Sequence, residues 1–486
     1  MPGFFVRPDR ANIVTRATDS RANRGDFLQF QWNPNGLRWY VPCSFPAFTG
    51  RRSPMREVSR GRLAAKLAVW SLCWILLIPQ LARADVIKLT KPAPAEQLFN
   101  NGLAALAKND LAGAESAFMQ SLKLEPKAAS SMLGLAQVAV KRGDRKAAAD
   151  YLQRAFTMAP DSAEVQQDWG RYKYSEGKYK EAEAAFRAAA RIDPTGVRAR
   201  VDLGDMYVMA FRKPGEAIPF YREAITLDPK HGGAHYGLGM ALTMSGDEAG
   251  AISSLSQAAA LSPDNPLPYY QLGRLHESKR RFDQAMEAFG RALKVAPAFA
   301  PALYERGNLL LEKKDDAGAI REFSAAAKAD PRLVDPHVRL GMIYQQRKQW
   351  AEAEASYLAA IKLDARHAVA YNNLAWMAAE RKVELNDGLT WARKAISIAP
   401  AVSQFQTTLG WVQRARGELD QAAQTLARAA ALKPERAEAF YYLAMAHLDR
   451  GKRAEGIESL KKALAIDPRF PNAVDAKQRL KALGQS

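Results

Sequence analysis

Cysteine is nearly missing from this chain of 486 residues, because its two cysteines, Cys43 and Cys73, both precede residue 85. From residue 85 onward the chain can form no disulfide and offers no thiolate to a metal ion. A chain without cysteine avoids mispaired disulfides in an oxidising compartment. The absence is therefore compatible with export, although it does not establish export.

The sequence also lacks the usual signs of catalysis. It contains no HExxH, no GxSxG and no glycine-rich phosphate loop after a strand, since no segment alternates convincingly as a strand does. Its six histidines never stand at metal-ligand spacing. Its carboxylates lie mostly among lysine and arginine, which is typical of solvated helix faces. We therefore expect no enzyme activity, no catalytic residue, no cofactor and no metal.

A concentrated basic patch is missing as well, despite a net charge of +19. Residues 1–84 hold 13 Lys/Arg and 4 Asp/Glu, whereas the rest of the chain holds 57 and 47. Nearly half of the excess thus belongs to the first 84 residues. Nucleic-acid binding needs basic residues gathered on one face. We expect no nucleic-acid partner.

No apolar run reaches the roughly 20 residues that a stable membrane-spanning helix needs. The longest without charge or proline, Leu67–Ile78, has 12. Basic residues precede it after Met55, Pro79 ends it, and Ala82-Arg83-Ala84 suits a signal peptidase. We interpret residues 55–84 as a signal peptide cleaved before Asp85, and residues 1–54 as a misassigned extension. The alternative is a disordered tail before an uncleaved anchor in the inner membrane, facing the periplasm.

The remaining chain is periodic. Prolines recur at intervals of 34 residues, with two intervals of 35, from Pro126 to Pro468, and Ala365 fills the one missing place. A period of this length indicates a solenoid of stacked repeats. We number eleven repeats over residues 95–468, after a linker at 85–94. Each predicts two helices, and residues 469–486 predict a C-terminal capping helix.

The repeats resemble the tetratricopeptide repeat family at positions that recur in every repeat. Position 8 is Gly or Ala in all eleven, and a second-helix alanine is followed four residues later by a large residue in most. Small residues let two crossing helices approach, and the large residue fills the adjacent space. Examples are Gly102, Gly170, Gly273, Gly307 and Gly341, with Ala114, Ala182, Ala285, Ala319 and Ala353, and with Phe118, Phe186, Phe289, Phe323 and Tyr357. The resemblance implies an all-α solenoid superhelix.

In that family the first helix of each repeat lines a concave groove through positions 2, 5, 9, 12 and 13. The resemblance therefore implies that these positions bind a partner. Tyr, Trp, Met and Arg are enriched at binding interfaces. The alternative is that some of the rings pack against neighbouring repeats. The predicted groove residues are Tyr236, Met240, Tyr270, Arg274, Tyr304, Asn308, Met342, Gln345, Trp376, Trp411, Arg414, Tyr441 and Met445.

Two functions follow as hypotheses. The first is a periplasmic scaffold that binds a protein or peptide segment in the groove, within an envelope assembly or secretion complex. The second is a glycan-binding or polysaccharide-export accessory protein, because tyrosine and tryptophan can stack on sugar rings. A membrane contact is expected only through an uncleaved signal.

Overall fold

The structure is a computed structural model that describes residues 93–485. The predictions for residues 1–54 and 55–84, and most of the predicted linker, lie outside these residues. The described residues form two compact parts, an N-terminal part that ends at Met206 and a C-terminal part that begins at Tyr207. Helix α8 crosses this boundary.

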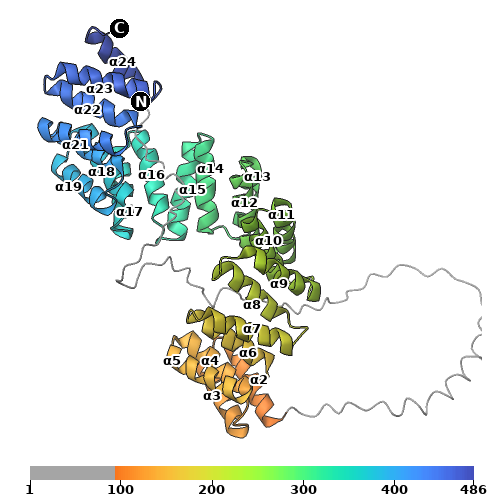
Figure 1. Cartoon of the computed structure of the whole chain (residues 1–486). Helices are drawn as coiled ribbons and strands as arrows, with labels where there is room; N and C mark the ends of the chain where they lie inside the picture. Colours follow the sequence, from red (N-terminus) through yellow and green to blue (C-terminus); the bar gives the residue numbers. More distant parts are fainter. Residues whose placement is uncertain (1–92, 486) are drawn as a thin grey trace, which may run out of the picture. The chain divides into compact units, whose positions relative to one another are not determined.

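Every regular element within residues 93–485 is an α-helix, and there are 23 of them (Figure 1). This confirms the predicted all-α solenoid and its succession of helix pairs. In repeats 1–4 the pairs are α2 (Pro94–Ala107) and α3 (Leu111–Leu124), α4 (Ala129–Arg142) and α5 (Arg145–Met158), α6 (Ala163–Ser175) and α7 (Tyr179–Ile192), α8 (Val197–Met209) and α9 (Pro214–Leu227).

The C-terminal part continues the same pattern to the end of the described chain. Repeats 5–8 comprise α10 (Gly232–Ser245) and α11 (Glu248–Leu261), α12 (Pro266–Ser278) and α13 (Phe282–Val295), α14 (Ala300–Glu312) and α15 (Asp316–Ala329), α16 (Asp335–Gln346) and α17 (Trp350–Leu363). Repeats 9–11 and the last helix comprise α18 (Ala368–Arg381) and α19 (Leu385–Ile398), α20 (Ser403–Ala415) and α21 (Leu419–Leu432), α22 (Ala437–Asp449) and α23 (Arg453–Ile466), and α24 (Ala473–Ala482).

Each helix pair is held by one close approach at position 8. In repeat 7 the ring of Phe323, which is fully buried, lies directly on Gly307. A methyl group placed on Gly307 would lie 2.6 Å from Cε1 of that ring. The same arrangement recurs at Gly102, Gly170, Gly273 and Gly341. The small residue and the aromatic ring thus fill one site together, as the sequence predicted.

Short turns with side-chain caps separate the helices. The carboxylates of Asp110, Asp144, Asp247 and Asp315 accept hydrogen bonds from the backbone N–H three residues later. Such a cap satisfies one of the four free donors at a helix start. His231 and His367, which the sequence places in turns between repeats, cap α10 and α18 through Nδ1. Both histidines therefore have a structural role.

Helix α24 ends the solenoid as the predicted cap. It buries Ala473, Ala476 and Leu480 and directs polar residues outward. Arg453 on α23 donates a hydrogen bond of 2.8 Å to the carbonyl oxygen of Leu483. The last repeat consequently does not leave its apolar face open to water.

Candidate partner-binding surface

All thirteen predicted groove residues lie on first helices of repeats 5–11, in the C-terminal part. Their exposure divides them. Met342, Gln345, Trp376, Tyr441 and Met445 are at most 8% exposed, so they offer little area to a partner. Arg274 is exposed, and the others are half-buried, namely Tyr236, Met240, Tyr270, Tyr304, Asn308, Trp411 and Arg414.

Three of the predicted tyrosines tie one repeat to the next through their hydroxyl groups. Tyr236 accepts a hydrogen bond of 3.3 Å from Nε2 of Gln271 in repeat 6. Tyr304 accepts one of 3.4 Å from Nε of Arg339 in repeat 8. Each bond joins position 5 of one first helix to position 6 of the next. We call these inter-repeat bonds rungs.

The third rung joins the last repeat to the cap. Tyr441 donates a hydrogen bond of 2.7 Å to Oδ2 of Asp475 on α24. Burial raises the pKa of Tyr441, and the bond to the Asp475 carboxylate raises it further. Tyr441 thus holds the cap in place, which explains why a position-5 residue is buried here.

Tyr270 occupies the same position in repeat 6 but is held by ring packing. Its centroid lies 5.7 Å from Phe289 and 5.5 Å from Phe299, which precedes α14. Burial raises the pKa of Tyr270 to about 12, with a further contribution from the Glu305 carboxylate. The alternative of packing against neighbours therefore applies to part of this side chain.

The two predicted tryptophans form a cluster with Tyr442. Trp376 and Trp411 stack with centroids 5.8 Å apart, and Tyr442 meets both rings edge-on at 5.4 and 4.8 Å. Arg414 lies over the Trp411 ring at 4.6 Å and pairs with Asp449 at 2.6 Å. Each tryptophan thus spends one face on the other, which reduces what either can offer to a ligand.

Gln345 belongs to a buried polar network. Its Oε1 accepts a 2.8 Å hydrogen bond from the Tyr357 hydroxyl, which in turn accepts one of 3.2 Å from Asn373. The Tyr357 ring is fully buried, and burial raises its pKa. A buried polar group without a partner costs free energy. Gln345 therefore satisfies the core tyrosine of its own repeat.

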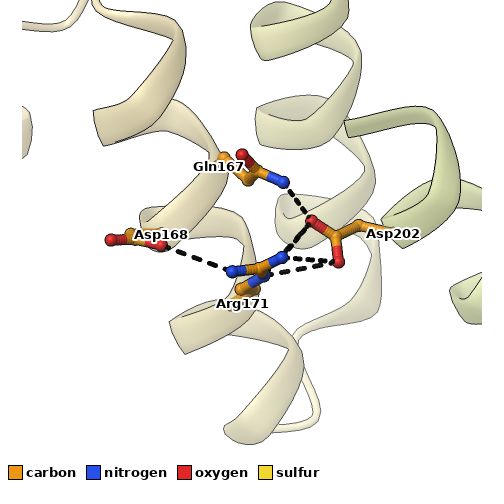
Figure 2. Close-up of polar contacts among 4 residues, drawn as sticks. All are labelled: Gln167, Asp168, Arg171 and Asp202. Carbon is orange, nitrogen blue, oxygen red and sulfur yellow. Dashed lines mark hydrogen bonds and ion pairs between the residues drawn. The ribbon is translucent and has the colours of Figure 1, made fainter. Parts of the chain in front are cut away.

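One polar cluster on first helices escaped the sequence analysis, although two of its residues stand at groove positions 5 and 9. In the N-terminal part, Asp202 on α8 accepts hydrogen bonds from Gln167 at 2.5 Å and from Arg171 on α6 (Figure 2). Arg171 also lies 3.7 Å from Asp168. Burial raises the pKa of Asp168, and Arg171 opposes this effect. The signal was the charge of these residues, whereas the analysis followed aromatic residues.

Neither a metal site nor a membrane-crossing helix emerges from the described part of the chain. Among residues 93–485, no three His, Cys, Asp or Glu side chains come together as a metal-binding group. None of the described helices combines the length and the apolarity that crossing a bilayer requires. The absence of enzyme activity stays a prediction.

Comparisons with solved structures return repeat proteins. The anaphase-promoting Cut9–Hcn1 assembly, titled as an APC/C hetero-tetramer, is 14% identical and covers 85% of this chain and 99% of that one, with a TM-score of 0.41. Yeast Tom70 is 15% identical and covers 80% and 95%, with a TM-score of 0.35. MamA is 27% identical and covers 36% and 94%, with a TM-score of 0.32. Scores this low carry no information about partners.

No curated protein matches this chain. Family models, in contrast, match most of it, and none of them describes an enzyme. Models described as tetratricopeptide repeats match residues 99–163, 168–231, 208–266, 270–333 and 407–471, and a further one matches residues 334–367. The helix pairs and the small residue at position 8 agree with these matches. The chain belongs to the tetratricopeptide repeat family.

Proposed function

We propose that the chain is a non-catalytic scaffold that binds a segment of a partner protein on the first helices of repeats 5–7. The family is a protein-interaction fold, which supports the general class. The observation that carries the proposal is the uneven exposure of the predicted groove. Repeats 5–7 keep Tyr236, Met240, Tyr270, Arg274 and Asn308 half-buried or exposed, whereas repeats 9–11 bury most of theirs.

The chemistry of this surface suits an extended peptide. Arg274 is an exposed donor, and the rings of Tyr236, Tyr270 and Tyr304 offer partly exposed apolar area. Asn308 donates to Glu305 at 3.1 Å, while its Oδ1 has no donor among the described residues. A peptide amide could satisfy that oxygen after a small rotation of the side chain. Such mixed surfaces are typical of interfaces held by a few anchors.

The location is part of the same proposal. Export to the periplasm is supported only by the sequence of residues 55–84, which lie outside the described residues. N-terminal sequencing of the protein from cells tests it, because cleavage before Asp85 predicts Asp85 as the first residue. A chain that begins earlier would contradict cleavage. The glycan alternative has no structural observation in its favour, since Trp376 and Trp411 stack on each other.

The partner surface is tested with a triple variant of the full chain, Met240→Ala, Arg274→Ala and Asn308→Ala. We expect a protein that is captured from cell extract by the wild type to be lost with this variant. Direct binding of the purified partner, measured by calorimetry, should then fall at least tenfold.

A matched control separates the surface from general effects of truncation. Three second-helix residues of similar type, all exposed or nearly so, supply it in the form of Leu358→Ala, Arg291→Ala and Gln284→Ala. This control should bind as the wild type does. If both variants keep the partner, or if both lose it while remaining folded, repeats 5–7 are not the binding surface.

A further inference from the structure

A row of basic residues occupies one backbone position in four consecutive repeats. The turn between the two helices of each repeat contains a residue with positive φ, and in repeats 2, 3, 5, 10 and 11 it is glycine. In repeats 6–9 the same place is taken by a basic residue, 34 residues apart each time. These residues are Arg280, Lys314, Lys348 and Lys382, with φ of 60°, 62°, 58° and 56°. We call them the turn row.

The backbone at these positions favours glycine. A side chain in the left-handed region crowds its own carbonyl group, which is why residues other than Gly, Asn and Asp seldom adopt it. A strained conformation kept at a recurring place suggests a use for the side chain. Repeats 2, 3, 5, 10 and 11 show that this fold accepts glycine there. The side chains of the turn row are therefore not needed to form the turn.

The turn row is also left without counter-charges. All four residues are exposed, and among the described residues none makes an ion pair or a side-chain hydrogen bond. Their basic neighbours are paired instead. Lys279 and Arg281 pair with Glu248, Lys313 pairs with Asp283 at 2.7 Å, and Arg381 lies 3.8 Å from Glu354.

The nearby carboxylates are mostly engaged. Asp315 caps α15 by accepting from Gly318, and Glu352 accepts from Gln349. Glu312, Asp316, Glu380 and Glu384 stand in or beside the same turns without a printed bond to the row. The pairing thus neutralises the flanking cations and leaves four charges at regular intervals.

Consecutive turns lie side by side, so the four charges form a line. The pair between Lys313 in the turn of repeat 7 and Asp283 at the start of α13 in repeat 6 shows this directly. The pair between Lys279 and Glu248 does the same for repeats 6 and 5. Packed helices lie about 8–10 Å apart, so the line spans roughly 30 Å.

We propose that the turn row binds an extended acidic segment of a partner protein. An extended chain rises about 3.3–3.6 Å per residue, so three residues match one step of the row. The fitting segment carries Asp or Glu at about every third position. A bilayer surface fits less well, because Val383 is the one exposed large hydrophobic residue beside these turns in the described chain. This edge is distinct from the first-helix surface proposed above.

The test uses a full-chain variant with Lys314→Gly, Lys348→Gly and Lys382→Gly. Glycine removes three charges and relieves the backbone, so the melting temperature should stay the same or rise. The probe is a fluorescein-labelled 12-residue peptide (a length chosen as about 10 Å per three residues) with glutamate at every third position. Its anisotropy should report binding about tenfold weaker than that of the wild type.

The matched control replaces another series with the same spacing. Lys294, Lys328 and Lys362 lie exposed on second helices in ordinary helical backbone. Their replacement by alanine removes the same charge and should change peptide binding less than about threefold. A peptide of the same composition with its glutamates adjacent should bind the wild type more weakly.

Several outcomes would overturn the proposal. If the wild type does not bind the spaced peptide, or if both lysine variants weaken binding equally, the row has no specific role. If vesicles with anionic lipid bind through the row and the peptide does not, the partner is a membrane. If the glycine variant melts at a lower temperature, the lysines serve the fold.

Discussion

Replacing Gly307 by alanine tests the close approach at position 8, and it should destabilise the protein. The new methyl group would lie 2.6, 2.8 and 2.9 Å from three atoms of the Phe323 ring, which is fully buried. Overpacking a core costs about 1–3 kcal/mol. Alanine is favoured over glycine inside a helix by about 1 kcal/mol. We therefore expect the free energy of unfolding to fall by about 1–2 kcal/mol.

The other repeats suggest how to reverse this loss. Where position 8 is alanine, the residue facing it is not aromatic. Repeat 2 has Ala136 with Leu152, and repeat 11 has Ala444 with Leu460. Phe323→Leu alone should cost roughly 1–2 kcal/mol because it leaves a cavity. Adding Gly307→Ala to it should cost nothing further, which corresponds to a coupling of about 1–2 kcal/mol.

The assay is urea unfolding, combined with amide hydrogen exchange of α14 and α15, because repeat proteins can open locally. Gly290→Ala on α13 is the control. A methyl group there meets nothing within 4 Å, so it should stabilise the protein by about 0.5–1 kcal/mol. If Gly307→Ala stabilises as Gly290→Ala does, or if the double variant shows no coupling, the ring does not select glycine.

Three further substitutions follow from particular contacts. Tyr441→Phe removes the bond to Asp475 and should cost about 1–3 kcal/mol, seen as faster hydrogen exchange in α24. Asp315→Ala removes the cap on α15 and should cost about 1 kcal/mol in urea unfolding. Burial lowers the pKa of His276, so the unfolded chain takes up its proton first. Stability should therefore fall as the pH drops below about 6.5, and His276→Leu should lessen that slope in thermal melts. Unchanged exchange in α24, an unchanged urea midpoint, or an unchanged slope would contradict these in turn.

The repeat period predicted the helix pairs well because it reports local requirements. A small residue at position 8 and a proline after the second helix are needed in each repeat, whatever its neighbours are. The two intervals of 35 residues fall within turns, and in repeat 9 Lys382 and Glu384 both adopt positive φ. An extra residue in a turn leaves the helices on either side intact.

The candidate surface was less predictable, because position within a repeat does not settle burial. Trp376 and Met342 stand at position 9 as Arg274 does, yet the first two are buried and the third is exposed. The difference comes from residues in the next repeats, such as Tyr442 beside Trp376. Such contacts link residues 34 or more positions apart. A pattern read within one repeat cannot contain them.

The rungs also have a mechanical consequence. The joint between repeats 5 and 6 and that between 7 and 8 each carry a directional bond from a tyrosine hydroxyl, while Tyr270 meets Phe299 at the joint between 6 and 7 by ring contact alone. A hydrogen bond weakens steeply when its angle is disturbed, whereas rings can slide and keep much of their contact. If this stretch were pulled or bent, the middle joint would yield first. Repeats 5–8 would then behave as two stiff pairs joined by an elastic link.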